Sequence, residues 1–307
     1  NGFTGSWSGS AVPWEDGKMK ILISACLLGI PCRYDGKAKP QPWAEALAGR
    51  HDLVPVCPEQ LGGLPTPRTP SERRGDRVVM NTGADVTEQY RRGAEAALRL
   101  CRLTGCPLHI QHITTKRGLD LVAAAKAEGL PVTCEVTPHH MFLTEDAITA
   151  EYQTALKVNP PLRTAEDAAA LIEGLANGTI DAIVTDHAPH SREEKSKGLE
   201  KSAMGVVGLE TSFAASYTHL VKKRILPLEK LVELMHTSPM RRFGCGTEIA
   251  VGQPADLTVF DLNETYTVDP EKFLTMGRAT PFTGTHLTGA CKLTMIGGEI
   301  VWKEDTL

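Results

Sequence analysis

Residues 181–190 read DAIVTDHAPH, and this stretch decides the class of fold. Its first half, DAIVT, is a short apolar run of the kind that forms a strand buried in a parallel sheet. Its second half places the carboxylate of Asp186 beside two histidines, His187 and His190, where that strand should end. Parallel α/β folds carry their functional side chains at the carboxyl ends of the strands. The stretch therefore predicts a parallel α/β fold with a site at this end.

The same alternation of short apolar runs and amphipathic stretches extends on both sides of residue 181. We expect strands over residues 20–25, 53–56, 108–113, 131–136, 155–158 and 181–185. Between them, residues 85–103 and 165–176 carry apolar side chains at helical spacing. Asp85 or Thr87 is placed to cap the first helix and Thr164 the second. The pattern is that of strand-helix repeats around a parallel sheet.

The alternation of predicted strands and helices ends after Thr185. A polar loop leads into expected helices near residues 208–221, 227–235 and 239–243. Residues 256–260 and 287–302 then read as strands, with Gly297-Gly298 as a hairpin turn. The end of the chain is therefore predicted to form a small antiparallel β layer.

Bulk composition excludes several classes of protein. The chain has 307 residues, 41% of them hydrophobic and 23% charged, as expected for a globular protein. A formal net charge of -4 and a pI near 6.2 provide no basic field for nucleic acid. The longest apolar stretch, residues 21–30, is too short to span a bilayer. We therefore expect a cytoplasmic protein with no nucleic-acid or membrane partner, whose eight cysteines stay reduced.

Residues 1–18 are rich in Gly, Ser and Trp, show no periodicity and precede Met19. We interpret them as a tail or fusion scar and exclude them from the fold.

Polar side chains follow four successive predicted strands. They are His112 after the strand at 108, Pro138-His139-His140, Asn159-Pro160-Pro161-Leu162-Arg163, and Asp186 to His190. A lone histidine after a strand is more often a hydrogen-bonded loop residue than a ligand, and Asn-Pro-Pro alone can be only a turn. A carboxylate beside two histidines is a natural metal ligand and general base. Together the four segments favour a metal-dependent hydrolase.

These segments resemble bacterial dihydroorotases, which are cyclic amidohydrolases, from about Thr104 onwards. The motifs are residues 111–116 (QHITTK), 135–140 (EVTPHH), 159–163 (NPPLR), 181–190 (DAIVTDHAPH), 205–210 (GVVGLE), 252–257 (GQPADL) and 280–282 (TPF). The resemblance implies that residues 104–250 form the C-terminal half of a TIM-type (β/α)8 barrel. It assigns residues 251–307 to part of a small β layer.

The same resemblance assigns roles to individual residues. His112 would be a zinc ligand, and Asp186 the last zinc ligand and the base that takes a proton from the attacking water. Asn159 and His190 would hold the substrate, a pyrimidine precursor, with the backbone of Met204 and Gly205 over its ring. The implied reaction interconverts dihydroorotate and carbamoyl aspartate in pyrimidine biosynthesis. Family members usually have Phe at the position of Met204.

The remaining zinc ligands of that family should precede Thr104. No His-x-His pair occurs before His112, and His51 is the only histidine before His109. Zinc needs at least three protein ligands, so we expect impaired activity. His109 and Cys106 are candidate substitutes.

Residues 19–103 resemble a different family, the thiouracil desulfidases. The motifs are residues 24–29 (SACLLG), 32–36 (CRYDG) and 54–68 (VPVCPEQLGGLPTPR). The resemblance implies a 4Fe-4S cluster held by three cysteines. Cys26 and Cys57 match two of those positions, and Cys101, Cys106 or Cys134 would have to supply the third.

Three hypotheses follow. The first is an impaired, dihydroorotase-like, zinc-dependent hydrolase of a cyclic amide. The second is an iron-sulfur desulfidase-like protein. The third is a non-catalytic relic that binds a pyrimidine or partners a complete barrel. About six parallel strands cannot close a barrel that needs eight, so we expect an open α/β sheet and a tendency to form homo-oligomers.

Overall fold

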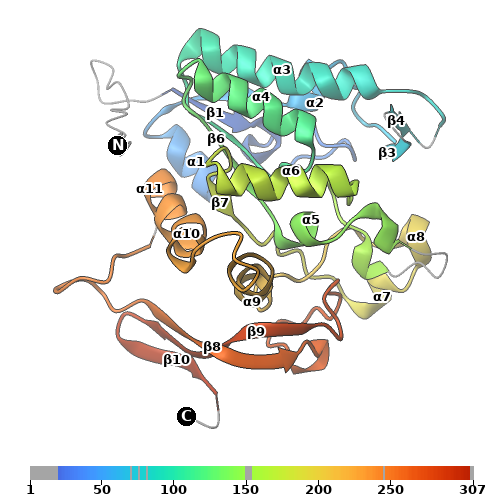
Figure 1. Cartoon of the computed structure of the whole chain (residues 1–307). Coiled ribbons are helices and arrows are strands. Elements are labelled where there is room, and N and C mark those ends of the chain that lie inside the picture. The colour runs from blue at the N-terminus through green and yellow to red at the C-terminus, as the bar shows by residue number, and fades with distance from the viewer. Residues whose placement is uncertain are drawn as a thin grey trace. The chain divides into compact units, whose positions relative to one another are not determined.

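The computed structural model describes residues 20–69, 71–74, 77–80, 82–148, 154–244 and 246–304 (Figure 1). The chain divides into two compact units by its internal contacts. The first unit comprises Asn1–Leu108 and Ala124–Val132, and the second His109–Ala123 and Thr133–Leu307. The predicted tail, residues 1–18, lies outside the described residues. Across the ranges given above, no helix is long and apolar enough to cross a membrane.

The first unit contains a parallel strand pair and a hairpin. Its elements are β1 (Lys20–Ser24), η1 (Ala25–Leu28), α1 (Pro42–Ala48), β2 (Asp52–Val56), α2 (Pro58–Leu61), β3 (Ser71–Arg74), β4 (Arg77–Met80) and α3 (Thr87–Thr104). β1 and β2 pair in parallel, with Ile21 opposite Leu53, so both strands predicted here are confirmed. The antiparallel β3–β4 hairpin was not predicted, because a strand as polar as SERR shows no apolar alternation.

Helix α3 begins two residues later than predicted. Its N-cap is Val86, whose side chain cannot cap, but Asp85 Oδ1 accepts the Thr87 backbone N–H at 3.0 Å and the Thr87 hydroxyl at 2.7 Å. Gly105, with φ of 67°, ends the helix in the left-handed conformation. Asp85 lies one position before the N-cap and Thr87 one position after it, so neither is the cap that the sequence predicts, although they bond to each other where the helix begins.

Helices α2 and α3 approach each other closely at two glycines. A Cβ on Gly62 would overlap the Gln89 carbonyl oxygen and lie 2.9 Å from its carbon. A Cβ on Gly93 would overlap the Pro58 carbonyl oxygen and lie 3.0 Å from its carbon. Because both neighbours are backbone atoms, only displacement of a helix can make room.

We expect Gly62→Ala to destabilise the fold by about 2–3 kcal/mol, as an overpacked contact does. Gly49→Ala is the matched control, because its Cβ would lie 3.6 Å from Ala46 O with φ at -70°. That control should leave stability unchanged or raise it by about 0.5 kcal/mol. Urea unfolding of both variants measures the difference, and equal midpoints would contradict the close approach.

The second unit contains the strands that carry the predicted site. β6 (Val132–Val136) pairs in parallel with β7 (Ala182–Ile183), and β5 (Leu108–Ile110) lies on the other side of β6. Val132, Cys134 and Val136 are fully buried, as expected for a central parallel strand. The associated helices are α4 (Lys116–Ala127), α5 (Pro138–Phe142), η2 (Glu145–Ala147) and α6 (Ala165–Ala176). Residues 124–127 of α4, Leu108 of β5 and Val132 of β6 belong to the first unit. The predicted helix 165–176 is confirmed, including its cap, because the Thr164 hydroxyl accepts the Asp167 N–H.

One predicted strand is wrong. Residues 155–158 do not pair in a sheet, and Thr154–Leu156 form a 3-10 turn, η3. Leu156 and Val158 are buried with Leu162 and Val206 in a small cluster. Their apolar character therefore reflects burial in a loop. The five predicted strands that do form lie in two sheets, β1-β2 and β5-β6-β7, and not in one continuous sheet.

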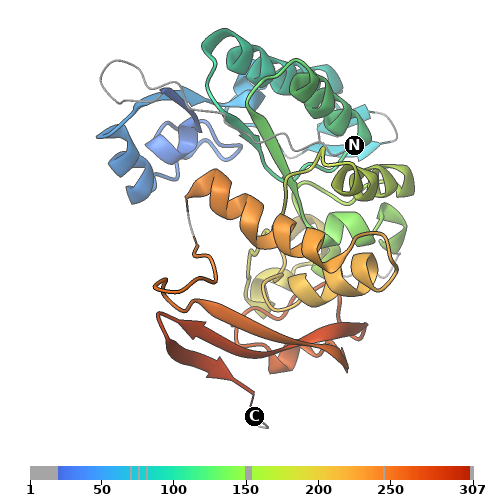
Figure 2. The same ribbon diagram turned by 60° about the vertical axis from the view of Figure 1, so that its left-hand side comes forward.

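The rest of the second unit consists of short helices and an antiparallel sheet. The helices are α7 (Arg192–Lys195), α8 (Gly198–Lys201), α9 (Ser212–Ser216), η4 (Tyr217–Val221), α10 (Leu228–Val232), η5 (Glu233–Thr237), α11 (Ser238–Phe243) and η6 (Pro270–Lys272). The sheet has the order β10-β9-β8, formed by Glu299–Lys303, His286–Ile296 and Leu257–Thr267. The turn at Gly297-Gly298 is confirmed, with φ of 59° and 87°. Helix α9 packs on this sheet (Figures 1 and 2), burying Ala214 and Ala215 with Leu287.

Candidate functional site

His112 and Asp186 lie directly beyond the ends of β5 and β7, where the sequence predicts a site. Both have left-handed backbones, with φ of 40° at His112 and 44° at Asp186. Non-glycine residues rarely adopt this conformation, and residues held in it cluster at functional sites. The turn into this conformation also explains why β5 ends at Ile110 and β7 at Ile183, earlier than predicted.

These two side chains belong to a connected row of titratable groups. His112 Nε2 lies 4.0 Å from Asp186 Oδ1. On its other side, His112 Nδ1 lies 3.5 Å from Glu135 Oε1, a distance at which charge attraction acts without a formed hydrogen bond. His109 Nε2 lies 2.9 Å from the second oxygen of Glu135. Glu135, on β6, therefore stands between two imidazoles.

The surroundings of Glu135 and Asp186 drive their pKa values in opposite directions. Burial alone would raise the pKa of Glu135, but the hydrogen bond from His109 and the charge of His112 lower it to about 2. Burial raises the pKa of Asp186, and repulsion by Glu135 adds to that effect while His112 opposes it. Two carboxylates with separated pKa values are the usual arrangement for different acid-base roles. Glu135 stays ionised, and Asp186 is the carboxylate that more readily takes up a proton.

The imidazole of His112 is the cation of this row. Its burial disfavours the charged form, but the nearby Glu135 and Asp186 carboxylates raise its pKa. The protonated imidazole of His112 therefore persists beside Asp186 to higher pH than that of an ordinary histidine.

Glu135 was not among the predicted site residues. The sequence contains a signal for it, because a charged residue inside the otherwise apolar strand VTCEV is buried only when paired. His109 was a candidate substitute ligand for zinc. Both of its ring nitrogens are engaged, Nε2 by Glu135 and Nδ1 by the Thr133 hydroxyl at 2.8 Å.

The described residues do not fit a zinc site. Among them, no group of three or more His, Cys, Asp or Glu side chains is arranged to hold a metal ion. Of the predicted ligands, His112 and Asp186 supply two, whereas zinc needs at least three from the protein. The other predicted substitute, Cys106, lies in the first unit, where its carbonyl accepts the Cys101 thiol at 3.1 Å.

The predicted substrate residues His190, Met204 and Gly205 lie together. His190 Nε2 donates to the Met204 carbonyl at 2.9 Å. A Cβ on Gly205, where φ is 130°, would lie 2.6 Å from Ala188 Cβ, so this position excludes a side chain. The two loops run side by side, because His187 and Val206 form a parallel bridge and Ala188 N donates to Val206 O. This bridge joins the segment of Asp186 to that of Met204 and Gly205.

Asn159 is exposed, in the loop after η3. Its neighbour Pro160 is bound through its carbonyl to His140 Nε2 at 2.7 Å. A carbonyl can only accept, so Nε2 carries the proton and Nδ1 accepts the Thr137 hydroxyl at 2.7 Å. The buried His140 thus anchors the loop of Asn159 in one tautomer.

Cys26 and Cys57, the predicted pair of the first unit, both lie near Cys32. Cys57 Sγ lies 3.7 Å from the Cys32 carbonyl, while the Cys26 thiol lies 3.3 Å from the Ser24 hydroxyl. Burial raises the pKa of Cys32 to about 11, and the neighbouring Cys57 and Cys26 thiols add to this rise. The thiol that lies beside the predicted pair, Cys26 and Cys57, is therefore that of Cys32.

The predicted third cysteines have other partners. Cys101 bonds to the Cys106 carbonyl, and Cys134, in the second unit, contacts Thr179 O at 3.5 Å. In the part of the chain that the structure describes, no group of three or more cysteine side chains is arranged to hold a metal ion.

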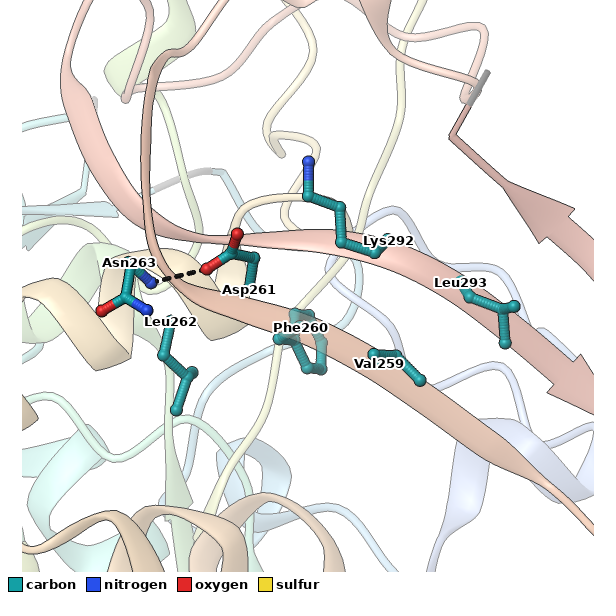
Figure 3. A pocket seen from close by; sticks show the side chains of 7 residues that line it. All are labelled: Val259, Phe260, Asp261, Leu262, Asn263, Lys292 and Leu293. Carbon is teal, nitrogen blue, oxygen red and sulfur yellow. Dashed lines mark hydrogen bonds between the residues drawn. The ribbon is translucent and has the colours of Figure 1, made fainter. Parts of the chain in front are cut away.

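A hollow of the described surface lies on the antiparallel sheet (Figure 3). It has a volume of about 520 Å³ and is lined by residues 259–263 of β8 and Lys292 and Leu293 of β9. It contains none of the predicted site residues. A smaller hollow of about 290 Å³ includes His190, Ser191 and Lys195. The smaller hollow is therefore the one that adjoins the candidate site.

Comparison with known proteins identifies the family. The model of the amidohydrolase family matches residues 85–301, and that of 2-thiouracil desulfurase matches residues 21–112. Both resemblances inferred from the motifs are therefore confirmed.

Two relatives are dihydroorotases of Geobacillus. The protein of Geobacillus sp. (strain WCH70) is 46% identical over 206 residues, which are 67% of this chain and 48% of the relative. That of Geobacillus thermodenitrificans (strain NG80-2) is 47% identical over the same shares. The chain thus spans about half the length of the curated relatives it matches.

A solved structure with the same fold is the L-hydantoinase (dihydropyrimidinase) from Arthrobacter aurescens. It superposes with a TM-score of 0.65 and 37% identity over 70% of this chain and 49% of that protein. The predicted α/β class with parallel strands is confirmed, and the fold is that of amidohydrolases. On the strength of the match over residues 85–301, this chain belongs to the amidohydrolase family.

Proposed function

We propose that the second unit binds a cyclic amide of the dihydroorotate type and that this chain turns it over at an impaired rate. The observation that carries the proposal is the His112–Asp186 pair, two strand-end side chains in left-handed conformation with 4.0 Å between Nε2 and Oδ1. The two relatives named above are dihydroorotases, which supports this choice of substrate. His190 and the backbone of Met204 and Gly205 would hold the ring.

Asp186 is the proton carrier in this proposal. Hydrolysis adds water to the amide carbonyl, breaks the carbon-nitrogen bond and protonates the leaving ring nitrogen, which converts dihydroorotate to carbamoyl aspartate. Asp186 takes the proton from the attacking water and delivers it to that nitrogen. Burial raises the pKa of Asp186 above its ordinary value, which makes its carboxylate a stronger base than an exposed aspartate. His112 provides positive charge beside the reaction.

The expected impairment of turnover follows from the small number of predicted zinc ligands. The family resemblance implies zinc, but the described residues do not provide three ligands, so no step is assigned to a metal here. A carboxylate activates water less strongly than a metal ion that lowers the pKa of that water to about 7. We therefore expect turnover well below about 10 s⁻¹, the median for enzymes.

Calorimetric titration of the full chain with dihydroorotate tests the binding. We expect a Kd at or below about 1 mM, the upper range of ordinary KM values, with succinate as the non-binding control. Formation of carbamoyl aspartate is followed on the same sample, with and without added zinc. Absence of binding would overturn the proposal, and turnover at ordinary rates with stoichiometric zinc would overturn the impairment.

A desulfidase function for the first unit stays a prediction. The family model matches residues 21–112, and among the described residues no group of three or more cysteines is arranged to hold a metal ion.

A further inference from the structure

Residues 202–205 form a segment whose carbonyl groups are all bound by side chains from elsewhere in the second unit. Lys157 Nζ donates to Ser202 O at 2.7 Å. Lys195 Nζ donates to Ala203 O at 2.9 Å and to Gly205 O at 2.8 Å. His190 binds the remaining carbonyl, that of Met204. Because each carbonyl is taken up, the peptide planes of this segment have one orientation.

Lys195 is unusual for a lysine because it is only 5% exposed. Lysines are almost never so buried unless they are paired with a charge. The acceptors of its ammonium group are backbone carbonyls, the third being Lys157 O at 3.5 Å. Three N–H donors therefore meet three acceptors. Burial and the charge of Lys157 lower the pKa of Lys195 to about 8. The charged amine is therefore less stable at this position than in water.

The helix that carries Lys195 is itself fixed. α7 starts with a capping box, in which Ser191 and Glu194 exchange side-chain and backbone hydrogen bonds. The segment that it binds is also held from the other side, because Gly205 N donates to Lys157 O at 2.9 Å. Close contact of Gly205 with Ala188 leaves no room for a side chain at this position. These contacts make residues 202–205 a rigid strap.

We propose that Lys195, together with Lys157, is a positioning residue that fixes the 202–205 strap as the peptide surface on which the cyclic amide binds. The inference rests on the proposed function, since it takes the Met204–Gly205 backbone as the part that faces the ring. A cyclic amide offers an N–H and a carbonyl, which pair best with peptide groups that are already oriented.

Lys195→Met tests whether the Lys195 ammonium group holds the strap, because methionine keeps nearly the length of the side chain and removes its donors. The matched control is Lys197→Met, two residues further on, where the lysine is exposed and pairs with Glu193 at 3.6 Å. Hydrogen exchange by mass spectrometry measures the strap, and titration with dihydroorotate measures binding. We expect exchange over residues 202–206 to rise and Kd to weaken by about tenfold in Lys195→Met, a change of about 1.4 kcal/mol, and neither to change in the control.

A rescue experiment distinguishes two roles of the Lys195 side chain, namely hydrogen bonding to the strap and filling of the space beneath it. Lys195→Ala is measured with propylammonium and with propanol, which have similar size but differ in charge and in the number of donors. We expect protection of residues 202–206 to return with the ammonium compound alone. Rescue by both compounds, or no change in exchange in Lys195→Met, would overturn the proposal.

The outcomes are distinguishable from failure of the proposed function. If the wild-type chain does not bind dihydroorotate, the proposed function fails, while exchange still decides whether Lys195 orders the strap. If Lys195→Met does not fold, Lys157→Met carries the test, because it removes the hydrogen bond to Ser202 O at the start of the strap. Faster hydrogen exchange confined to the start of the strap is then expected. Unchanged exchange would overturn the proposal that the two lysines hold the strap.

Discussion

Asp186→Asn is expected to lower dihydroorotate hydrolysis by about 10²–10⁴-fold, the usual contribution of a general acid-base group. The amide cannot take up a proton from water or deliver it to the leaving nitrogen. Asparagine has nearly the same shape and tolerates φ of 44° better than most residues, so the fold should be retained. Steady-state formation of carbamoyl aspartate measures the effect.

Binding is expected to respond in the opposite direction. Dihydroorotate is an anion, so removal of the Asp186 charge should leave its Kd unchanged or tighten it. Asp120→Asn, on the exposed face of α4, is the matched control and should alter neither rate nor affinity. Wild-type hydrolysis rates in Asp186→Asn would contradict its role as proton carrier.

The second large effect is a loss of stability in acid, which we attribute first to His140. Burial lowers its pKa to about 4, although its bond to the Pro160 carbonyl opposes this. In the unfolded chain the same group titrates near 6.5. Between these values the unfolded state binds a proton and the folded state does not, so stability falls as pH decreases from 6.5 to 4. The difference corresponds to about 3 kcal/mol, fully present above pH 6.5.

Two neighbours extend the acid response. Burial also lowers the pKa of His139 well below its usual value, so its contribution is likewise lost as the pH falls below 6.5. The pKa of Glu135 is about 2, so its contribution is present above the unfolded value near 4.5 and is lost as pH falls from there towards 2. We therefore expect stability to decline in two consecutive steps.

Urea unfolding at a series of pH values between 7 and 3 measures these steps. His140→Gln keeps a donor for Pro160 and an acceptor for Thr137 but cannot titrate. This variant should be less stable at pH 7 and should lose less stability between pH 6.5 and 4. The same pH dependence in both proteins would rule out His140 as the cause.

Local patterns were sufficient wherever nearby residues determine structure. The helix Ala165–Ala176 and its Thr164 cap depend on contacts within one or two turns. The Gly297-Gly298 hairpin likewise follows from two residues that accept positive φ. The strand predicted over residues 155–158 failed because apolar residues in a loop cluster and in a strand look alike over so short a stretch.

By itself, the sequence determined that this is an α/β protein with His112 and Asp186 at strand ends, because periodicity and motifs are local properties of the chain. Only the tertiary structure decided which groups these residues meet. It placed Glu135 between two imidazoles and Lys195 beneath the 202–205 strap, and it brought Cys57 against Cys32. Such partners come from different strands and loops, and their pKa values depend on burial. Both are set by how the elements pack, which no local pattern encodes.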